Sequence, residues 1–431
     1  MTSYEPVIGL EVHTQVKTRS KMFCDCPATV FGREPNTATC PVCLGLPGAL
    51  PVPNAVAIEK TVVLAKALGC QLATFSQFER KNYFYPDLPK GFQISQYAGP
   101  VGREGKLAGI NITRVHLEED TGRLLHEPTE TLVDFNRSGI PLIEIVTEPE
   151  FSDPKVVSQF LKELRNLLVH LEISTADMEK GSLRLEANIS LRKVGERGLP
   201  PYKVELKNIN SFAFLEEALG AEIARQQRLL AMGEVVVQET RGFDEKRRLT
   251  VSQRRKEEAF DYRYFPEPDL PPLTAKSLKS AVRIRTPERI REEYRALGLP
   301  EKYGEVFIRD RELATIFEEV QKEIPAEEAA NILVNKRFGD PKRLGARRIL
   351  EAFHSRKRQV LITGEELQSL AEKVVLDNPA AVSDYSAGKA AALQFLLGQL
   401  MRETKGRISP VEGKELLRKI IDARTKASSQ N

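Results

Sequence analysis

Residues 111–149 combine the β-strand pattern with carboxylates at positions that should face a core. In the segment NITRVHLEE, alternation puts Glu119 on the same side as Val115 and Leu117, and in PLIEIV it puts Glu144 among apolar neighbours. An ionised carboxylate on an apolar face is costly unless a cation or several hydrogen-bond donors meet it. The pattern therefore predicts a metal site or a catalytic site on these strands.

A second polar stripe runs along the first predicted strand, VIGLEVHTQV, at residues 7–16. Alternation puts Glu11 and His13 on one face and the apolar residues on the other. A carboxylate and an imidazole two residues apart on a strand can hold one cation or contact one substrate group. A solvated outer face explains this stripe equally well by itself, but the acidic strand that ends at Glu119 favours the functional interpretation.

Residues 80–97, RKNYFYPDLPKGFQISQY, have the composition of a binding loop, with basic and aromatic residues broken by proline and glycine. Lys81 and Lys90 can meet phosphates, and Tyr83 can stack on a base or cover a substrate. A proline-rich loop fixed to the surface by aromatic packing is the competing interpretation. For this segment alone, that structural interpretation is slightly favoured.

Helical periodicity and strand alternation follow one another in the segments that must position these side chains. Asn54 can cap the first helix, and Gly69 can end it. Strands with polar stripes of mixed sign, separated by helices, predict an α+β domain whose sheet buries one face and presents the other to a ligand. The predicted helices are 54–68, 153–171 and 214–232, and the later strands are 181–192 and 203–212.

Length and composition indicate a multidomain globular protein. The chain has 431 residues, too many for one ordinary core, so two or three domains are expected. Hydrophobic residues make up 41% and charged residues 29%, which is typical of a soluble protein. We find no apolar run that could span a bilayer and no signal-peptide pattern, so we expect a cytoplasmic location and no membrane partner.

Four cysteines show the clearest spacing in the chain. Cys24 and Cys26 are followed after thirteen residues by Cys40 and Cys43, in a segment rich in proline and glycine. Two close thiolate pairs at this separation suit a tetrahedral zinc site with four protein ligands and no open position, which is a structural site. Because a cytoplasmic chain seldom forms disulfides, zinc is favoured over two disulfide bridges.

Basic residues gather in the C-terminal third, although the formal net charge is only +4. Residues 336–358 hold nine lysines and arginines against two acidic residues. Such a segment can neutralise several backbone phosphates of a nucleic acid, although a solvated helix face is about as plausible. Gly339, Pro341 and Gly345 predict that the run does not form one continuous helix.

Six long motifs together resemble one family, the B subunits of the tRNA-dependent amidotransferases. That family makes Gln-tRNA(Gln) or Asn-tRNA(Asn) from mischarged Glu-tRNA or Asp-tRNA. The resemblance is dense over residues 1 to about 290, and DYSAGKAAALQFLLGQLMRETKG at 384–406 is similar to the family's tail. The motifs are VDFNRSGIPLIEIVTEP, KNYFYPDLPKGFQISQ, HLEEDTG, GSLRLEANIS, ELKNINSF and DYRYFPEPDLPPL.

The resemblance implies a glutamine-synthetase-like antiparallel-sheet cradle domain, an all-α helical domain and a small all-α tail domain that contacts tRNA. We place these at residues 1–290, with a zinc-binding insertion at 24–43, then at 291–362 and 363–431. The helical domain is expected to be shortened between about residues 315 and 365.

The resemblance also implies an ATP-dependent ligase that uses glutamine as the source of ammonia. ATP phosphorylates the side-chain carboxylate of the misattached amino acid, and ammonia from the amidase A subunit displaces the phosphate. A small C subunit completes the heterotrimer. Phosphoryl transfer between anions needs a divalent metal and basic residues to offset charge.

Motif position and charge select the site residues on this chain. Each of them could instead belong to a structural ion pair. The predicted catalytic residues are Glu11, His13, Glu119, Glu144, Arg184 and Glu186. The predicted nucleotide and phosphate contacts are Lys81, Tyr83, Lys90, Arg137 and Lys207. The predicted magnesium ligands are Glu11, His13, Glu119 and Glu148, and the predicted zinc ligands are Cys24, Cys26, Cys40 and Cys43.

An alternative function remains open. The chain could be a zinc-stabilised tRNA-binding scaffold, with acidic strands that are structural and chemistry that belongs to a partner. The presence of Glu11, His13, Glu119 and basic residues in one predicted cradle favours the catalytic interpretation.

Overall fold

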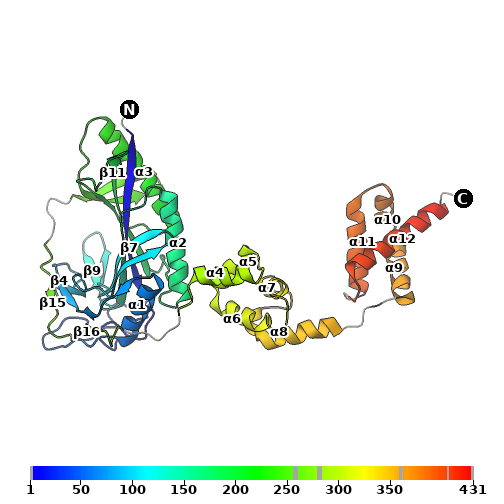
Figure 1. Ribbon diagram of the computed structural model, residues 1–431, viewed down its shortest axis with the longest axis horizontal. Helices are drawn as coiled ribbons and strands as arrows, with labels where there is room; N and C mark the ends of the chain where they lie inside the picture. Colours follow the sequence, from blue (N-terminus) through cyan, green and yellow to red (C-terminus); the bar gives the residue numbers. More distant parts are fainter. Residues whose placement is uncertain are drawn as a thin grey trace. The chain divides into compact units, whose positions relative to one another are not determined.

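The computed structural model describes residues 3–255, 261–278, 284–358, 362, 364–404 and 407–428 (Figure 1). The chain divides into two compact units, Met1–Arg311 and Glu312–Asn431. The predicted boundaries at residues 290 and 362 stay predictions. No helix in the described ranges combines the length and the apolar composition that a membrane crossing needs.

A nine-stranded sheet organises the N-terminal unit. Its strand order is β14-β13-β12-β11-β1-β10-β7-β6-β2, and neighbouring strands are antiparallel except for the parallel pair β12 and β13. This sheet, followed by helices along the chain, confirms the α+β prediction. The strands are β1 (Tyr4–Gln15), β2 (Gln71–Leu72), β6 (Gly102–Leu107), β7 (Ile110–Glu119), β10 (Pro141–Thr147), β11 (Leu183–Lys193), β12 (Val204–Leu206), β13 (Glu239–Asp244) and β14 (Leu249–Arg255).

Helices α1 (Ala55–Ala67), α2 (Pro154–His170) and α3 (Phe212–Ala231) pack on the apolar face of this sheet (Figure 1). The predicted cap on α1 is confirmed, because the Asn54 side chain accepts hydrogen bonds from the backbone N–H groups of Val56 and Ala57. Ile8, Leu10 and similar residues of β1 are fully buried against the helices. The sheet therefore buries one face, which leaves the alternate side chains of each strand for the other face.

Strand register brings distant polar residues together on that second face. His13 on β1 lies opposite Glu144 on β10 and opposite Arg184 on β11. Glu144 in turn lies opposite His116 on β7. Because directly opposed residues project to the same side of a sheet, these four side chains share one face.

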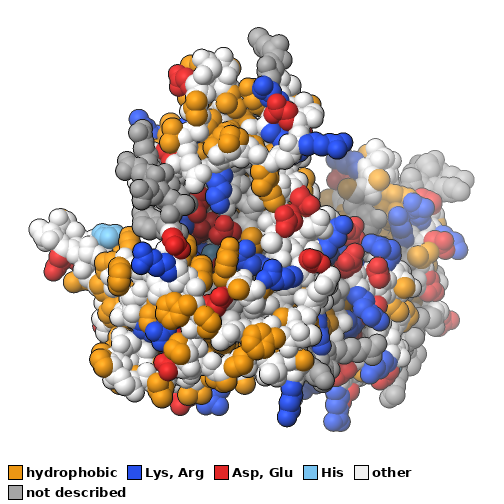
Figure 2. Space-filling view, turned by 60° about the vertical axis from the view of Figure 1, so that its left-hand side comes forward, with side chains coloured by type: hydrophobic (Ala, Val, Ile, Leu, Met, Phe, Trp, Pro, Cys, Tyr) orange, Lys and Arg blue, Asp and Glu red, His pale blue; other side chains and the backbone are white. Residues whose placement is uncertain are grey.

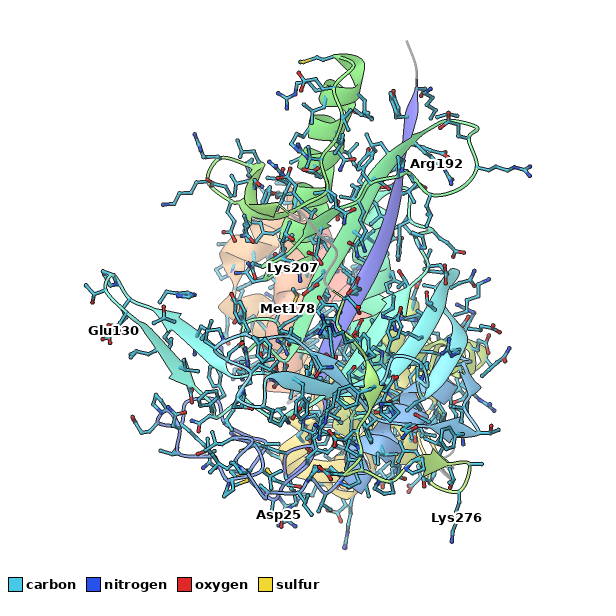
Figure 3. The ribbon with its side chains drawn as sticks, turned by 90° about the vertical axis from the view of Figure 1, so that its left-hand side faces the viewer. Asp25, Glu130, Met178, Arg192, Lys207 and Lys276 are labelled. Atoms are coloured by element: carbon cyan, nitrogen blue, oxygen red, sulfur yellow. The ribbon has the colours of Figure 1, made fainter. Side chains whose placement is uncertain are left out.

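Smaller sheets border the main one. A hairpin of β8 (Arg123–His126) and β9 (Thr131–Asp134) projects from the body, with Glu130 at its tip (Figure 3). The sheet β15-β4-β5 brings residues after 261 beside the 80–97 loop. The remaining strands are β3 (Phe75–Ser76), β4 (Glu79–Asn82), β5 (Phe92–Ser95), β15 (Phe265–Pro266) and β16 (Leu273–Thr274).

The C-terminal part of the chain is helical. Helix α8 is interrupted at Gly345, whose φ of 72° lies in the left-handed region that glycine tolerates best. This confirms that the basic run is not one continuous helix. The side chains of its last three basic residues, 356–358, lie outside the described part. The helices are α4 (Pro287–Ala296), α5 (Glu301–Arg309), α6 (Arg311–Val320), α7 (Ala326–Val334), α8 (Pro341–Arg358), α9 (Glu365–Asp377), α10 (Pro379–Ser386), α11 (Ala390–Glu403) and α12 (Pro410–Ser428).

Helix α3 is joined to the edge strands by a buried ionic network centred on Glu222. The Glu222 carboxylate is fully buried and accepts hydrogen bonds from Arg225, Gln226 and Thr250 at 2.7–2.9 Å. Arg241 on β13 lies 3.4 Å from the same carboxylate. A buried charge with this many partners stabilises the packing only while every partner is present.

We therefore expect Glu222→Gln to lower the free energy of unfolding by about 3 kcal/mol, because Arg225 and Arg241 lose one carboxylate and must share Glu239 as counter-charge. Glu217→Gln on the same helix is the matched control, since Glu217 is 39% exposed and pairs with Arg248 at the surface. Its expected cost is below about 1 kcal/mol. Urea titration of both variants measures the difference, and equal costs would contradict the role given to the network.

Candidate functional site

A cleft of about 670 Å³ lies on the polar face of the large sheet. Its floor comes from β1, β7, β10, β11 and β12, and its side wall comes from the 80–97 loop and residues 261–264. Figure 2 shows acidic side chains gathered in a hollow on this side of the molecule, with lysine and arginine side chains near its margin. The charged residues in the cleft are thus concentrated on one sheet face.

His13, Glu118 and Glu144 form the centre of the floor. The His13 Nε2 atom lies 3.4 Å from Glu118 Oε1 and 3.7 Å from Glu144 Oε2. His116 adds a second imidazole, with its Nε2 atom 3.1 Å from Glu144 Oε2. One ligand atom from each of His13, Glu118 and Glu144 lies within 4.8 Å of the others, so the three can share one cation.

The pKa values of this cluster reflect an excess of negative charge. Burial alone would lower the pKa of His13, but its hydrogen bond to Glu144 and the charges of Glu118 and Glu144 raise that pKa to about 9. Burial would raise the pKa of Glu144, but the two histidines hold it well below the usual range. Without a metal, His13 therefore carries a proton that offsets the carboxylates.

These residues fit a divalent cation. Magnesium favours carboxylate oxygens and retains several waters, and an imidazole ligand is more typical of manganese and other transition metals. Glu11 lines the same cleft, where its carboxylate accepts a hydrogen bond from Asn188 at 3.0 Å. Burial and the neighbouring carboxylates of Glu144 and Glu186 raise the pKa of Glu11. A bound cation would relieve this repulsion.

Basic side chains surround the acidic centre. Lys207 Nζ lies 2.8 Å from Glu186 and 3.4 Å from Glu205, and Figure 3 labels Lys207 directly after β12. Arg184 lies 2.7 Å from Asp120. Burial would lower the pKa of Lys81, but Glu118 and other nearby groups raise it, so Lys81 stays charged. These cations can receive phosphate oxygens beside a metal.

Tyrosines form the side wall. Tyr97 and Tyr264 stack with ring centroids 4.7 Å apart, and Tyr262 meets Tyr264 edge to face at 6.1 Å. Tyr83 contacts Tyr262, and Lys81 Nζ lies 4.8 Å from the centre of the Tyr262 ring. The wall thus holds Lys81 against the cleft by cation–π contact.

The structure brings most predicted site residues to this cleft, but it separates Glu119 from them. Residues 118 and 119 point to opposite faces of β7. Glu119 is buried on the apolar side, where it pairs with Lys90 and accepts a 3.0 Å hydrogen bond from Ile94 N. The structure therefore does not group Glu119 with Glu11 and His13, because the Glu119 carboxylate pairs with Lys90 instead.

Three further predicted residues also lie away from the central cluster. Lys90 is held by Glu119 on the far side of the strand. Glu148 lies beyond the end of β10 and accepts a hydrogen bond from Thr113. Arg137 donates to the backbone carbonyls of residues 121 and 122 and lies 3.6 Å from Asp120, so it reaches the cleft only indirectly.

Sequence reasoning missed Glu118, His116 and Asp120. Alternation puts Glu118 and His116 on the polar face, where charged residues are common, so they stood out less than the carboxylate on the apolar face. Asp120 is buried and follows the end of β7, where alternation no longer applies. Its ionised state is favoured because Arg184 and Arg137 lower its pKa against the effect of burial.

The four predicted zinc-ligand cysteines converge. The Sγ atoms of Cys24, Cys26, Cys40 and Cys43 all lie within 4.8 Å of one another. Zn–S bonds of about 2.3 Å in a tetrahedron place sulfurs about 3.8 Å apart, so the cluster fits zinc after small movements. Lys21, which is 1% exposed, lies 3.6 Å from Cys43 Sγ.

Hydrogen bonding prepares one of these thiols for a metal. The hydrogen bond from Cys24, the backbone N–H of Cys40 and the charge of Lys21 lower the pKa of Cys43 to about 4, although burial opposes the shift. The hydrogen bond to Cys43 and burial raise the pKa of Cys24. The lowered pKa favours the thiolate form of Cys43, which is the form that binds a metal, and zinc would replace the protons of the remaining thiols.

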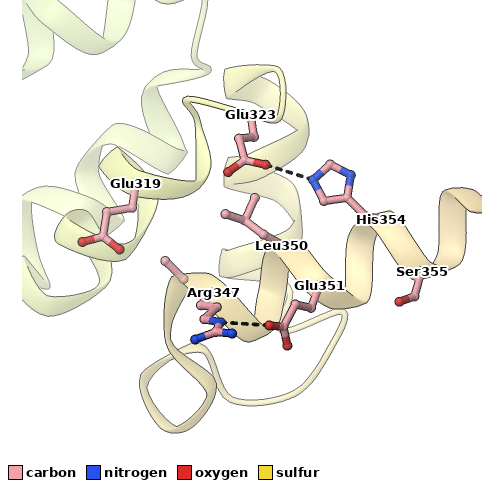
Figure 4. Close-up of a pocket in the computed structure, with 8 residues that line it drawn as sticks. Glu319, Glu323, Arg347, Leu350, Glu351, His354 and Ser355 are labelled. Atoms are coloured by element: carbon pink, nitrogen blue, oxygen red, sulfur yellow. Dashed lines mark hydrogen bonds and ion pairs between the residues drawn. The ribbon is translucent and has the colours of Figure 1, made fainter.

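A second cavity, of about 590 Å³, lies in the C-terminal unit between α6 and α8 (Figure 4). Its charged residues pair with one another: His354 lies 3.0 Å from Glu323, and Arg347 lies 3.0 Å from Glu351. These side chains are largely exposed, so the cavity lacks the buried, unbalanced charge of the cleft.

The cysteine cluster predicts a stoichiometric, stabilising metal. We expect Cys43→Ser to reduce bound zinc from one ion per chain to nearly none and to lower the melting temperature, because structural zinc contributes directly to folding. Metal analysis and calorimetry measure both effects. Cys70→Ser is the control, since Cys70 lies outside the quartet. Normal zinc content in Cys43→Ser would contradict the assignment.

Comparison with known proteins gives concordant matches along the chain. The family described as the GatB/GatE catalytic domain matches residues 6–279, and the GatB domain matches residues 304–421. A relative from Thermotoga maritima, the B subunit of an aspartyl/glutamyl-tRNA(Asn/Gln) amidotransferase, is 42% identical over 97% of this chain and 99% of its own length. A relative of the same name from Dehalococcoides mccartyi is 42% identical over 98% of this chain and 100% of its own length. The chain therefore belongs to the family of the aspartyl/glutamyl-tRNA amidotransferase B subunits.

Proposed function

We propose that the chain is the component in which the side-chain carboxylate of mischarged Glu-tRNA(Gln), Asp-tRNA(Asn) or both is phosphorylated by ATP and then amidated. The observation that carries this proposal is the convergence of His13, Glu118 and Glu144 on the floor of one cleft, ringed by basic side chains. The name of the relatives supports the same substrate class. The activity is that of a carbon–nitrogen ligase with glutamine as the amide donor.

The first step transfers a phosphoryl group between two anions. A carboxylate oxygen of the aminoacyl group attacks the γ-phosphorus of ATP, and the bond to the bridging oxygen breaks to release ADP. A divalent cation at His13, Glu118 and Glu144 would supply charge neutralisation between the phosphates. Lys81, Arg184 and the neighbouring Lys207 neutralise the remaining phosphate oxygens and hold the reacting groups together.

The second step replaces phosphate by nitrogen. Ammonia attacks the acyl carbon of the acyl phosphate, the carbon–oxygen bond to phosphate breaks, and the attacking nitrogen loses a proton as the amide forms. The carboxylates on the cleft floor are negatively charged, so they can stabilise an ammonium ion or accept this proton. Ammonia is supplied by an amidase A subunit, and a small C subunit completes the assembly.

The helical C-terminal part is assigned to tRNA binding. Exposed basic side chains on α8, including Arg343 and Arg347, are 89% and 92% exposed. Such residues contact phosphates by a salt-dependent attraction without reading sequence. This assignment leaves the chemistry in the N-terminal unit.

The test compares two neighbouring carboxylates on opposite faces of β7. In the complex with the A and C subunits, we expect Glu118→Gln to reduce tRNA-dependent ADP release by about 100-fold or more, because one metal ligand and its charge are lost. We expect Glu119→Gln to retain turnover per folded molecule and to lose stability, because Lys90 remains buried without its partner. ADP release with and without mischarged tRNA measures the first effect.

The competing function gives a different outcome. If the chain is a zinc-stabilised tRNA-binding scaffold without its own catalysis, Glu118→Gln and the unmodified chain will release ADP alike and bind tRNA alike. If Glu119→Gln loses ADP release and Glu118→Gln retains it, Glu119 is the metal ligand and Glu118 is not.

A further inference from the structure

One short segment, residues 133–139, lies between the cysteine cluster and the cleft. Asn136 in this segment is 1% exposed. Both the oxygen and the nitrogen of its amide contact residues 17–53, the loop that carries the four cysteines, here called the cysteine loop. Its Oδ1 atom accepts a 2.7 Å hydrogen bond from Ala38 N, and its Nδ2 group donates a 2.7 Å hydrogen bond to Glu34 O. Ser138, two residues further on, donates to Cys43 O at 3.1 Å. The segment is thus bonded directly to a predicted zinc ligand.

The cysteine loop returns the same kind of contact. The Asn36 amide donates to Val133 O at 3.0 Å and accepts from Phe135 N at 2.8 Å. Its backbone N–H donates to Asp134 Oδ1 at 3.0 Å. Asn36 of the loop therefore bonds the backbone of the segment, and Asn136 of the segment bonds the backbone of the loop. These side-chain bonds take the place of the backbone hydrogen bonds that would join two strands.

The loop itself has little regular structure to hold these contacts. Residues 17–53, all of which the structure describes, contain no helix and no strand longer than the isolated bridge between Ser20 and Pro27. Backbone conformation in such a segment is held by side-chain contacts and by any metal it binds. Ala38 is linked to the cysteines through Lys21, whose Nζ donates to Ala38 O at 2.8 Å and lies 3.6 Å from Cys43 Sγ.

On its other side, the segment reaches the cleft through Arg137. The Arg137 guanidinium donates to Thr121 O at 3.0 Å and lies 3.6 Å from Asp120 Oδ1. The Gly139 N–H donates to Asp120 O at 2.9 Å. The other oxygen of Asp120 lies 2.7 Å from Arg184 on β11.

Arg184 depends on this support. Its side chain is 35% exposed in the cleft, and its guanidinium lies 2.7 Å from the Asp120 carboxylate. Asp120 also accepts a 2.9 Å hydrogen bond from Gln15 and is fully enclosed. A shift of Arg137 would leave Asp120 with Arg184 as one cation in place of two. The Arg184 side chain would then move within the cleft, away from its place beside the ligand.

We propose that the cysteine loop fixes the positions of Arg137, Asp120 and Arg184 at one end of the cleft. Asn136 makes the connection, because it joins the loop to the segment that carries Arg137. Asn136 is a positioning residue, since it is turned toward the cysteine loop and away from any substrate. The inference rests on the proposed function only where it concerns nucleotide binding. The coupling between the two regions can be tested without reference to the reaction.

The first experiment measures arginine accessibility in Asn136→Ala of the full chain. Phenylglyoxal labelling with peptide mass spectrometry reports on Arg137 and Arg184 separately. With zinc content confirmed as unchanged, we expect both arginines to react severalfold faster than in the unmodified chain. Asn335→Ala is the matched control, because Asn335 is exposed on the C-terminal unit and its side chain bonds Asn331. Unchanged labelling in Asn136→Ala would overturn the proposal.

A second experiment avoids the risk that Asn136→Ala does not fold. Zinc is removed from the unmodified chain with a chelator and then restored, and the same labelling is followed. The proposal predicts faster labelling without zinc and full recovery when zinc is added back. Labelling that does not respond to zinc in a chain with retained secondary structure would overturn the proposal.

Nucleotide binding separates this inference from the proposed function. In the assembled complex, we expect Asn136→Ala to weaken ATP affinity by about tenfold while kcat at saturating ATP falls less, as expected when a supporting residue is lost. Asn136→Asp retains the acceptor for Ala38 N but turns a buried carboxylate oxygen toward Glu34 O, so it should weaken ATP affinity as Asn136→Ala does. If labelling changes but neither protein binds ATP, the coupling stands and the proposed function fails. If the unmodified complex and the Asn136→Ala complex bind ATP equally and arginine labelling is unchanged, the proposed coupling between the cysteine loop and the arginines fails.

Discussion

The repulsion among buried carboxylates on one sheet face is the constraint on which the rest of the structure depends. Glu118 and Glu144 are both buried and lie close together beside His13. Such a group is unfavourable by itself, and the protein offsets it with two imidazoles, a proton on His13 and a ring of cations. The antiparallel register of β7, β10, β1 and β11 holds these groups in place, because the opposite face is fixed by the hydrophobic core.

The arrangement separates structural charges from functional charges. Glu119 and Glu222 are also buried, but each meets cations that belong to the fold itself. The cleft carboxylates meet cations that remain partly accessible, such as Lys207 and Arg184 at 35% side-chain exposure each. A ligand that brings both phosphates and a metal can therefore exchange partners with the cleft residues without disturbing the core.

Much of this arrangement follows from the sequence. Alternation gave the correct faces of β1, and Asn54 marked the start of α1. The glycines and proline after residue 338 marked the interruption before and within α8. The choice between Glu118 and Glu119 did not follow, because it depends on Lys90, which is 29 residues away along the chain. His116 and Asp120 needed the strand register and the contact with Arg184, which local pattern does not contain. The cysteine spacing predicted the cluster, but its link to Arg137 arises from hydrogen bonds between loops far apart in sequence.

The most direct measurement is anomalous diffraction from crystals of the chain soaked with Mn²⁺. We predict a manganese peak between His13 Nε2 and the carboxylates of Glu118 and Glu144, with zinc at the four cysteines as an internal reference. Manganese at Glu119, or no manganese in the cleft while zinc is visible, would contradict the claim that the polar face of the sheet is the cation site.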